Sequence, residues 1–159
     1  MGIWIILGVV VILLIWVIAI FNNLVKLKMN RENAFADIDV QLKQRHDLIP
    51  QLVSTVKAFA KQEESVLTQV TQARARAMSA GTVNEKIAAE TALAGAMSQF
   101  SMQMEAYPDL KSNQNFMQLQ NEMSDIENKL SAVRRYFNSS TKEYNVGIQK
   151  LPNNIFWLY

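Results

Sequence analysis

The sequence has no cysteine, only one histidine, His46, and no glycine-rich loop of the kind that holds phosphate groups. Without cysteine there is no thiol nucleophile, and a serine nucleophile needs a base that is held beside it. No strand-turn-helix serine motif accompanies His46. We therefore expect no catalytic residue, no cofactor and no enzymatic activity.

Residues that interrupt helices are also scarce, with 5 glycines and 3 prolines among 159 residues. Alanine, glutamine, glutamate, lysine and leucine are abundant, and no run alternates β-branched or aromatic residues with polar ones. The sequence predicts an all-α protein. Its net charge of +2 is too small to indicate a nucleic-acid partner, so anionic lipid is the expected neighbour.

Charged side chains are absent from residues 1–21 (MGIWIILGVVVILLIWVIAIF). About 20 apolar residues in a helix span the hydrocarbon layer of a bilayer. A cleaved signal peptide would begin with basic residues and end in a small-residue cleavage site, which this segment lacks. We predict that residues 1–21 are an uncleaved transmembrane anchor.

No lysine or arginine precedes this anchor, whereas Lys26, Lys28 and Arg31 follow it closely. Positive charge favours the cytoplasmic side of a membrane. The expected topology is a single pass through the cell membrane, with the N-terminus outside and the remaining residues in the cytoplasm. Those residues are enough for one ordinary domain.

Apolar residues at three- and four-residue steps divide residues 22–151 into four amphipathic helices. The expected fold is a transmembrane helix that continues into an antiparallel up-and-down four-helix bundle. The turns are predicted at about residues 46–49, at Gly81 and at Tyr107–Asp109. Three helix starts are predicted, at Asp47 with Pro50, at Thr82 with Glu85 and at Ser112. The last helix is predicted to end at Gly147 and Pro152.

The apolar positions on either side of Pro50 keep the same helical phase, with Arg45 as the only polar member. A kinked but continuous helix through Pro50 is therefore an alternative to the turn. It would leave three helices and place the chain's C-terminal residues far from the bilayer. Arg45 and Glu63 interrupt apolar seams, so they are expected to specify helix pairing through buried or half-buried ion pairs.

A polar cluster in the first helix is the main candidate for a metal site, with Asp37, Asp39, His46 and Asp47. Asp39 and His46 lie two helical turns apart, and a zinc site would require more histidine or cysteine ligands. We predict no bound metal. Surface ion pairs and a helix-capping role for Asp47 are the preferred interpretation.

Residues 152–159 form an apolar, aromatic tail that the fourth helix is expected to bring back to the bilayer. Tryptophan and tyrosine collect at the level of the lipid headgroups. The alternative is that the tail packs on the bundle or on a neighbouring subunit. The residues predicted to face the membrane interface are Lys26, Lys28, Arg31, Arg74, Arg76, Trp157 and Tyr159.

Two long runs, AFADIDVQLKQRHDLIPQLVSTVKAFAKQE at residues 34–63 and ENKLSAVRRYFNSSTKEYNVGIQKLP at residues 127–152, resemble the LemA family of bacterial membrane proteins. Residues 73–77 and 115–127 are similar as well. The resemblance implies an N-terminal signal anchor and an up-and-down four-helix bundle, without established enzymatic activity or catalytic residues. The chain differs at Phe137, where a second tyrosine is common, and many relatives extend beyond the position of Tyr159.

The expected function is that of a membrane-anchored scaffold or adaptor, whose cytoplasmic helices bind other envelope proteins or a second copy of the chain. The alternative is a protein that assembles laterally into homo-oligomers and shapes or supports the bilayer.

Overall fold

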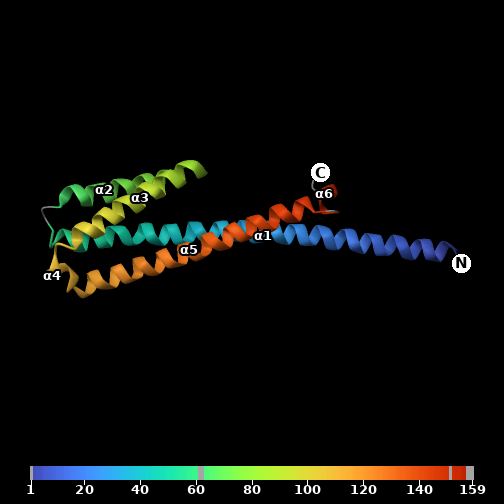
Figure 1. The fold of residues 1–159 in the computed structure, drawn as a ribbon, viewed down its shortest axis with the longest axis horizontal. Coiled ribbons are helices and arrows are strands. Elements are labelled where there is room, and N and C mark those ends of the chain that lie inside the picture. The colour runs from blue at the N-terminus through green and yellow to red at the C-terminus, as the bar shows by residue number, and fades with distance from the viewer. Residues whose placement is uncertain (1, 61–62, 151, 157–159) are drawn as a thin grey trace. The chain divides into compact units, whose positions relative to one another are not determined.

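The computed structural model describes residues 2–60, 63–150 and 152–156. Within these residues the regular structure is helical and no strand occurs, which confirms the all-α prediction. The helices are α1 (Gly2–Lys57), α2 (Glu64–Ser79), α3 (Val83–Met104), α4 (Pro108–Lys111), α5 (Gln114–Gln149) and α6 (Asn153–Phe156) (Figure 1).

The first part of α1 is long and apolar enough to cross a membrane, and its most apolar window has no buried residue. Trp4 is 78% exposed and Ile12 is 67% exposed. A core helix of a soluble protein would instead be mostly covered by its neighbours. The exposed apolar segment agrees with the predicted anchor and makes this part of α1 a candidate membrane span.

The predicted turn at residues 46–49 is wrong, because α1 continues through Pro50 to Lys57. Asp47 is an exposed residue inside this helix and does not cap a new one. The apolar face stays buried on both sides of the proline, with Ile49, Leu52 and Val56 at most 1% exposed. The alternative of a continuous helix is therefore correct for this stretch.

The first break in the chain comes about ten residues later than predicted, between Lys57 and Glu64. The Ala60 and Phe59 amides both donate to the Val56 carbonyl at 2.9 Å, which closes the end of α1. Phe59, which follows the end of α1, is 41% exposed. The described residues consequently still contain four long helices, and the three-helix alternative is wrong.

The predicted cap of α3 is confirmed. The Glu85 amide donates to the Thr82 hydroxyl at 3.2 Å, and the Thr82 amide donates to the Glu85 carboxylate at 3.0 Å. Hydrogen bonds with Thr82 hold the pKa of Glu85 below its ordinary value, and a hydrogen bond from the Gly81 amide adds a smaller effect. The cap of α5 differs from the prediction by one residue, because Asn113 rather than Ser112 accepts the Phe116 amide at 3.1 Å.

The chain divides into two compact units, and α1 and α5 each contribute to both. We call Val40–Leu130 the core unit and Met1–Asp39 with Ser131–Tyr159 the stem unit. The predicted boundaries separate the anchor, residues 1–21, from the helical bundle, residues 22–151, and the bundle from the tail, residues 152–159. These boundaries remain predictions.

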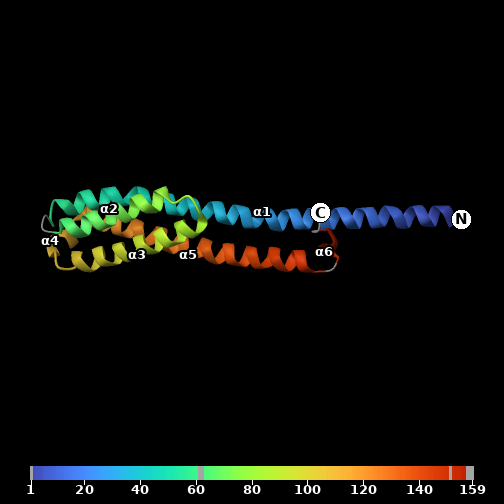
Figure 2. The same cartoon turned by 90° about the horizontal axis from the view of Figure 1, so that it is seen from above.

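Within the core unit, α2 and α3 lie side by side as a helical hairpin in both views (Figures 1 and 2). Most of the buried apolar side chains of this unit form one cluster that includes residues from α1, α2, α3, α4 and α5. Its members are Ile49, Leu52, Val56, Ala60, Leu67, Val70, Ala77, Leu93, Met97, Phe100, Met104, Leu110, Phe116 and Met123.

In the stem unit, the last turns of α5 lie against residues of α1 that follow the anchor. The Phe35 and Phe137 rings are 5.7 Å apart between centroids. The Arg31 guanidinium lies 5.0 Å from the centroid of the Tyr144 ring, within the range of a cation–π interaction. The residue numbers of the contacts increase along α5, from Phe137 to Tyr144, while those of their partners decrease along α1, from Phe35 to Arg31. The two helices are therefore antiparallel in this unit.

The last long helix ends at Gln149, between Gly147 and Pro152 as predicted, although Gly147 itself still lies inside α5. A Cβ atom at this position would lie 2.6 Å from Leu27 Cδ1. The absence of a side chain at Gly147 therefore leaves room for the Leu27 side chain of α1.

Candidate functional site

Three buried polar residues join α1 to α3 in the core unit. Arg45 is 5% exposed, His46 is 7% exposed and Glu90 is 6% exposed. Arg45 Nη2 donates to Glu90 Oε2, and His46 Nε2 lies 2.7 Å from Glu90 Oε1. Each oxygen of the carboxylate therefore has its own partner, as a buried carboxylate requires.

Burial by itself would raise the pKa of Glu90, since it penalises the charged carboxylate. The hydrogen bond with His46 and the positive charge of Arg45 outweigh this effect and hold the pKa of Glu90 below its usual value. A lowered pKa in the folded state means that the ionised carboxylate stabilises the fold. This stabilisation is present above the carboxyl group's unfolded-state pKa of about 4.3 and is lost as the pH falls through the lower, folded-state value.

Acidification is accordingly expected to remove the contribution of Glu90 to stability. The wild-type chain and Glu90→Gln, in detergent, should differ most in free energy of unfolding near neutral pH. The difference should shrink as the pH falls below about 4. Urea unfolding followed by circular dichroism at several pH values checks this. Glu105→Gln, at an exposed site, is the control. A difference that is constant from neutral pH to pH 3 would contradict the assignment.

Arg74 in α2 makes a second polar contact with this cluster. Its Nε donates to the backbone carbonyl of His46 at 2.6 Å. His46 precedes Pro50 by four residues, so its carbonyl is the one that would have accepted the amide hydrogen that proline lacks. The Arg74 guanidinium supplies a donor to this carbonyl in place of the missing amide.

The residues predicted to lie at the membrane interface have different surroundings. Arg74 is half-buried and bound to His46, and Arg31 is half-buried against Tyr144. Lys28 lies 3.9 Å from Glu32 in a solvent-exposed pair of the kind that adds little stability. Lys26 and Arg76 are exposed, whereas Trp157 and Tyr159 lie outside the described residues.

The polar cluster considered for a metal does not come together as a site. His46 is buried and engages Glu90, so the expectation that it forms a surface ion pair is wrong. Asp37 and Asp47 are exposed. Across residues 2–60, 63–150 and 152–156, no three histidine or acidic side chains are grouped so that they could hold a metal ion.

Glu90 was not identified as a candidate residue from the sequence, although its position in the apolar pattern of α3 could have indicated a buried ion pair. It continues the buried phase of Leu93, Met97, Phe100 and Met104 on α3. An acidic residue at an apolar position requires a buried partner, just as Arg45 does on α1. The two residues interrupt their seams with opposite charges and meet each other, which confirms the buried ion pair expected for Arg45.

Glu63, the other polar residue predicted in a seam, has a different kind of partner. Its Oε1 accepts a hydrogen bond from the Tyr107 hydroxyl at 3.0 Å. This bond and the nearby negative charge raise the pKa of Tyr107. The contact joins the segment before α2 to the segment before α4, and its neutral donor differs from the cation that was expected.

A surface groove of about 640 Å³ lies between α3 and α5 in the core unit. Its polar lining consists mainly of hydroxyl and amide side chains, while Met97, Phe100 and Met123 contribute apolar surface. Such a lining favours hydrogen bonding with a partner. The polar groups are Ser98, Ser101, Gln120, Asn121, Ser124 and Glu127.

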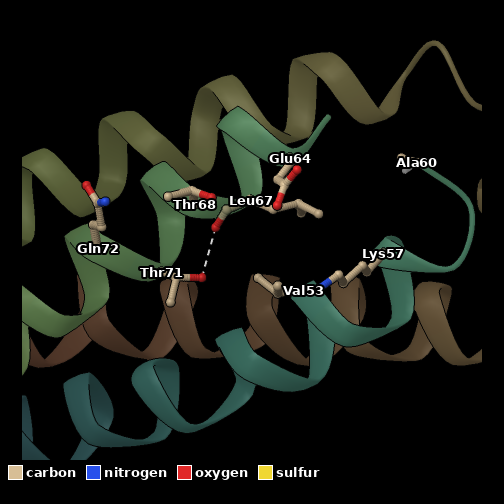
Figure 3. Close-up of a pocket in the computed structure, with 8 residues that line it drawn as sticks. All are labelled: Val53, Lys57, Ala60, Glu64, Leu67, Thr68, Thr71 and Gln72. Atoms are coloured by element: carbon tan, nitrogen blue, oxygen red, sulfur yellow. Dashed lines mark hydrogen bonds between the residues drawn. The ribbon is translucent and has the colours of Figure 1, made fainter. Parts of the chain in front are cut away.

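A smaller pocket of about 310 Å³ forms where α1 ends and α2 begins (Figure 3). Val53 and Lys57 line it from α1, and Glu64 and Thr71 line it from α2. The Thr71 hydroxyl donates to the Leu67 carbonyl at 2.8 Å, so it is engaged with its own helix.

These features define an all-helical protein with an N-terminal segment able to span a membrane and a polar cluster that joins its helices. A model of the LemA family matches residues 34–158, which is most of the chain. The chain therefore belongs to the LemA family, as its sequence runs predicted. No curated protein matches it.

Proposed function

We propose that this member of the LemA family is a membrane-anchored, non-enzymatic scaffold or adaptor that binds other envelope proteins through its helices. The proposal rests above all on α1. One unbroken helix carries both the exposed apolar segment and the face that packs into the core unit. Whatever binds the helical domain is thereby held close to the bilayer.

Our proposal includes an antiparallel up-and-down four-helix bundle formed by α1, α2, α3 and α5. The shared apolar cluster and the antiparallel contacts of α1 with α5 support this arrangement. The buried charges also support a structural role, because Arg45 and Glu90 are used to join helices. The groove between α3 and α5 is the proposed binding surface.

The proposed topology places the helical domain in the cytoplasm, because Lys26 and Lys28 follow the anchor and are exposed. Alkaline phosphatase fused after Lys150 should be inactive, and a fluorescent protein at the same site should be bright. The reverse pattern would show that the domain lies outside. In the proposed topology, anionic lipid faces the two exposed lysines, Arg76 and the predicted tail residues Trp157 and Tyr159.

Cross-linking in native membranes tests the adaptor function, because single cysteines can be placed in a sequence that has none. Ser101→Cys and Ser124→Cys lie in the groove between α3 and α5, while Ala75→Cys is exposed on α2 outside that groove. We expect a maleimide cross-linker to give discrete heterologous products from the groove positions and not from Ala75→Cys. Equal products from all three positions, or none, would contradict the proposal.

A second candidate function is lateral self-assembly into homo-oligomers that support the bilayer. It is favoured by exposed apolar residues near the turn between α2 and α3, where Met78, Val83 and Ile87 are 56%, 58% and 62% exposed. Such residues suit contacts between copies of a chain. In the same cross-linking experiment, self-assembly predicts a homodimer instead of heterologous products, because each variant carries a single thiol.

A further inference from the structure

Pro50 lies in the interior of α1, where proline normally breaks a helix or kinks it. Its ring has no amide hydrogen, so the His46 carbonyl loses the donor that a regular helix would provide. Arg74 Nε supplies a replacement at 2.6 Å. The hydrogen bonding of α1 at this point is thus completed by a side chain from another helix, α2.

The other helix of the hairpin holds the same residue through its side chain. His46 Nε2 contacts Glu90 of α3 at 2.7 Å, and the preceding Arg45 also binds that carboxylate. The backbone of His46 is therefore held by α2 and its imidazole by α3. Both helices of the hairpin engage α1 within one turn of its proline.

We propose that the α2–α3 hairpin is a lock on a proline hinge in α1. With the hairpin docked, Arg74 completes the hydrogen bonding of α1 and the helix passes Pro50 unbroken. With the hairpin released, the His46 carbonyl has no protein donor and α1 bends at residues 46–50. A partner that displaced the hairpin would thereby change the direction of α1, and a partner that held it would keep α1 stiff.

Distances between spin labels on either side of Pro50 test this proposal in the full chain in lipid nanodiscs. Labels are attached at Gln44→Cys and Lys57→Cys, which are exposed, lie on α1 and belong to the core unit. A continuous helix separates these Cα atoms by about 20 Å. We expect a single narrow distance distribution with Arg74 present. In Arg74→Met we expect a broad distribution shifted to shorter distances.

The decisive variant combines Arg74→Met with Pro50→Ala, because alanine restores an amide that can donate to the His46 carbonyl. The narrow distribution should then return without Arg74. Arg76→Met, at an exposed position on the same helix, is the matched control and should resemble the wild type.

Two results would overturn the proposal that the docked hairpin keeps α1 straight at Pro50. One is a narrow distribution in Arg74→Met, which would show that α1 does not depend on this donor. The other is broadening that persists in the double variant, which would show that Arg74 supports the fold by general packing. If Arg74→Met fails to fold, its rescue by Pro50→Ala takes the same place, and absence of rescue overturns the proposal.

Discussion

Replacing Glu90 with methionine is expected to lower the free energy of unfolding by about 3 to 5 kcal/mol, because the Arg45 guanidinium would remain buried without a counter-charge. Arg45 is 5% exposed, and its Nε already lacks a hydrogen-bond partner. The loss of Glu90 would therefore leave most of the guanidinium unsatisfied. Denaturant unfolding of the full chain in detergent, followed by circular dichroism, measures the change.

The double variant Arg45→Met/Glu90→Met separates the unpaired charge from general damage to the core. Removing both partners in favour of apolar side chains of similar volume is often close to neutral. The double variant should be more stable than Glu90→Met alone, and a lower stability would show that the ion pair is not the cause. Asp125→Ala is the control, since its pair with Lys129 is exposed and should contribute less than about 1 kcal/mol.

Truncating Phe100 or Phe116 to alanine is expected to lower the free energy of unfolding by about 3 to 5 kcal/mol each, because each change leaves a large cavity. Both side chains are 1% exposed and belong to the apolar cluster of the core unit. The measurement is again denaturant unfolding of the full chain in detergent.

The matched control for these truncations is Tyr136→Ala, an aromatic side chain on α5 that is 51% exposed. Its removal should change the free energy of unfolding by about 0.5 kcal/mol or less. A similar loss at Tyr136 and at Phe116 would mean that burial does not determine the effect.

The helical class, the capping box at Thr82 and the family could be predicted because local residues carry them. Thr82 and Glu85 satisfy each other's amides within one helical turn. The helix through Pro50 was harder to predict. Its apolar phase indicated continuity, whereas the lone proline indicated a turn. Arg74, which donates to the carbonyl left free by the proline, is 28 residues from His46 in sequence.

Other features depended on tertiary packing that a single sequence does not display. No proline or glycine lies between Lys57 and Glu64, so the break after α1 had no local marker. Gly147 was predicted near the helix end, but only the fold shows that its missing side chain leaves room for Leu27. Arg45 was predicted to need a buried partner, and only the fold identifies that partner as Glu90.

The contacts of the stem unit have a consequence for the order of folding. Phe35 meets Phe137, and Arg31 meets Tyr144, so each pair joins residues about 100 or more positions apart. Such contacts carry the largest loop-closure entropy, whereas the α2–α3 hairpin needs only a short connection. During synthesis, α1 leaves the ribosome long before α5 does. We therefore expect the hairpin to form early. The stretch of α1 that follows the anchor should acquire its helical neighbour only when α5 is complete.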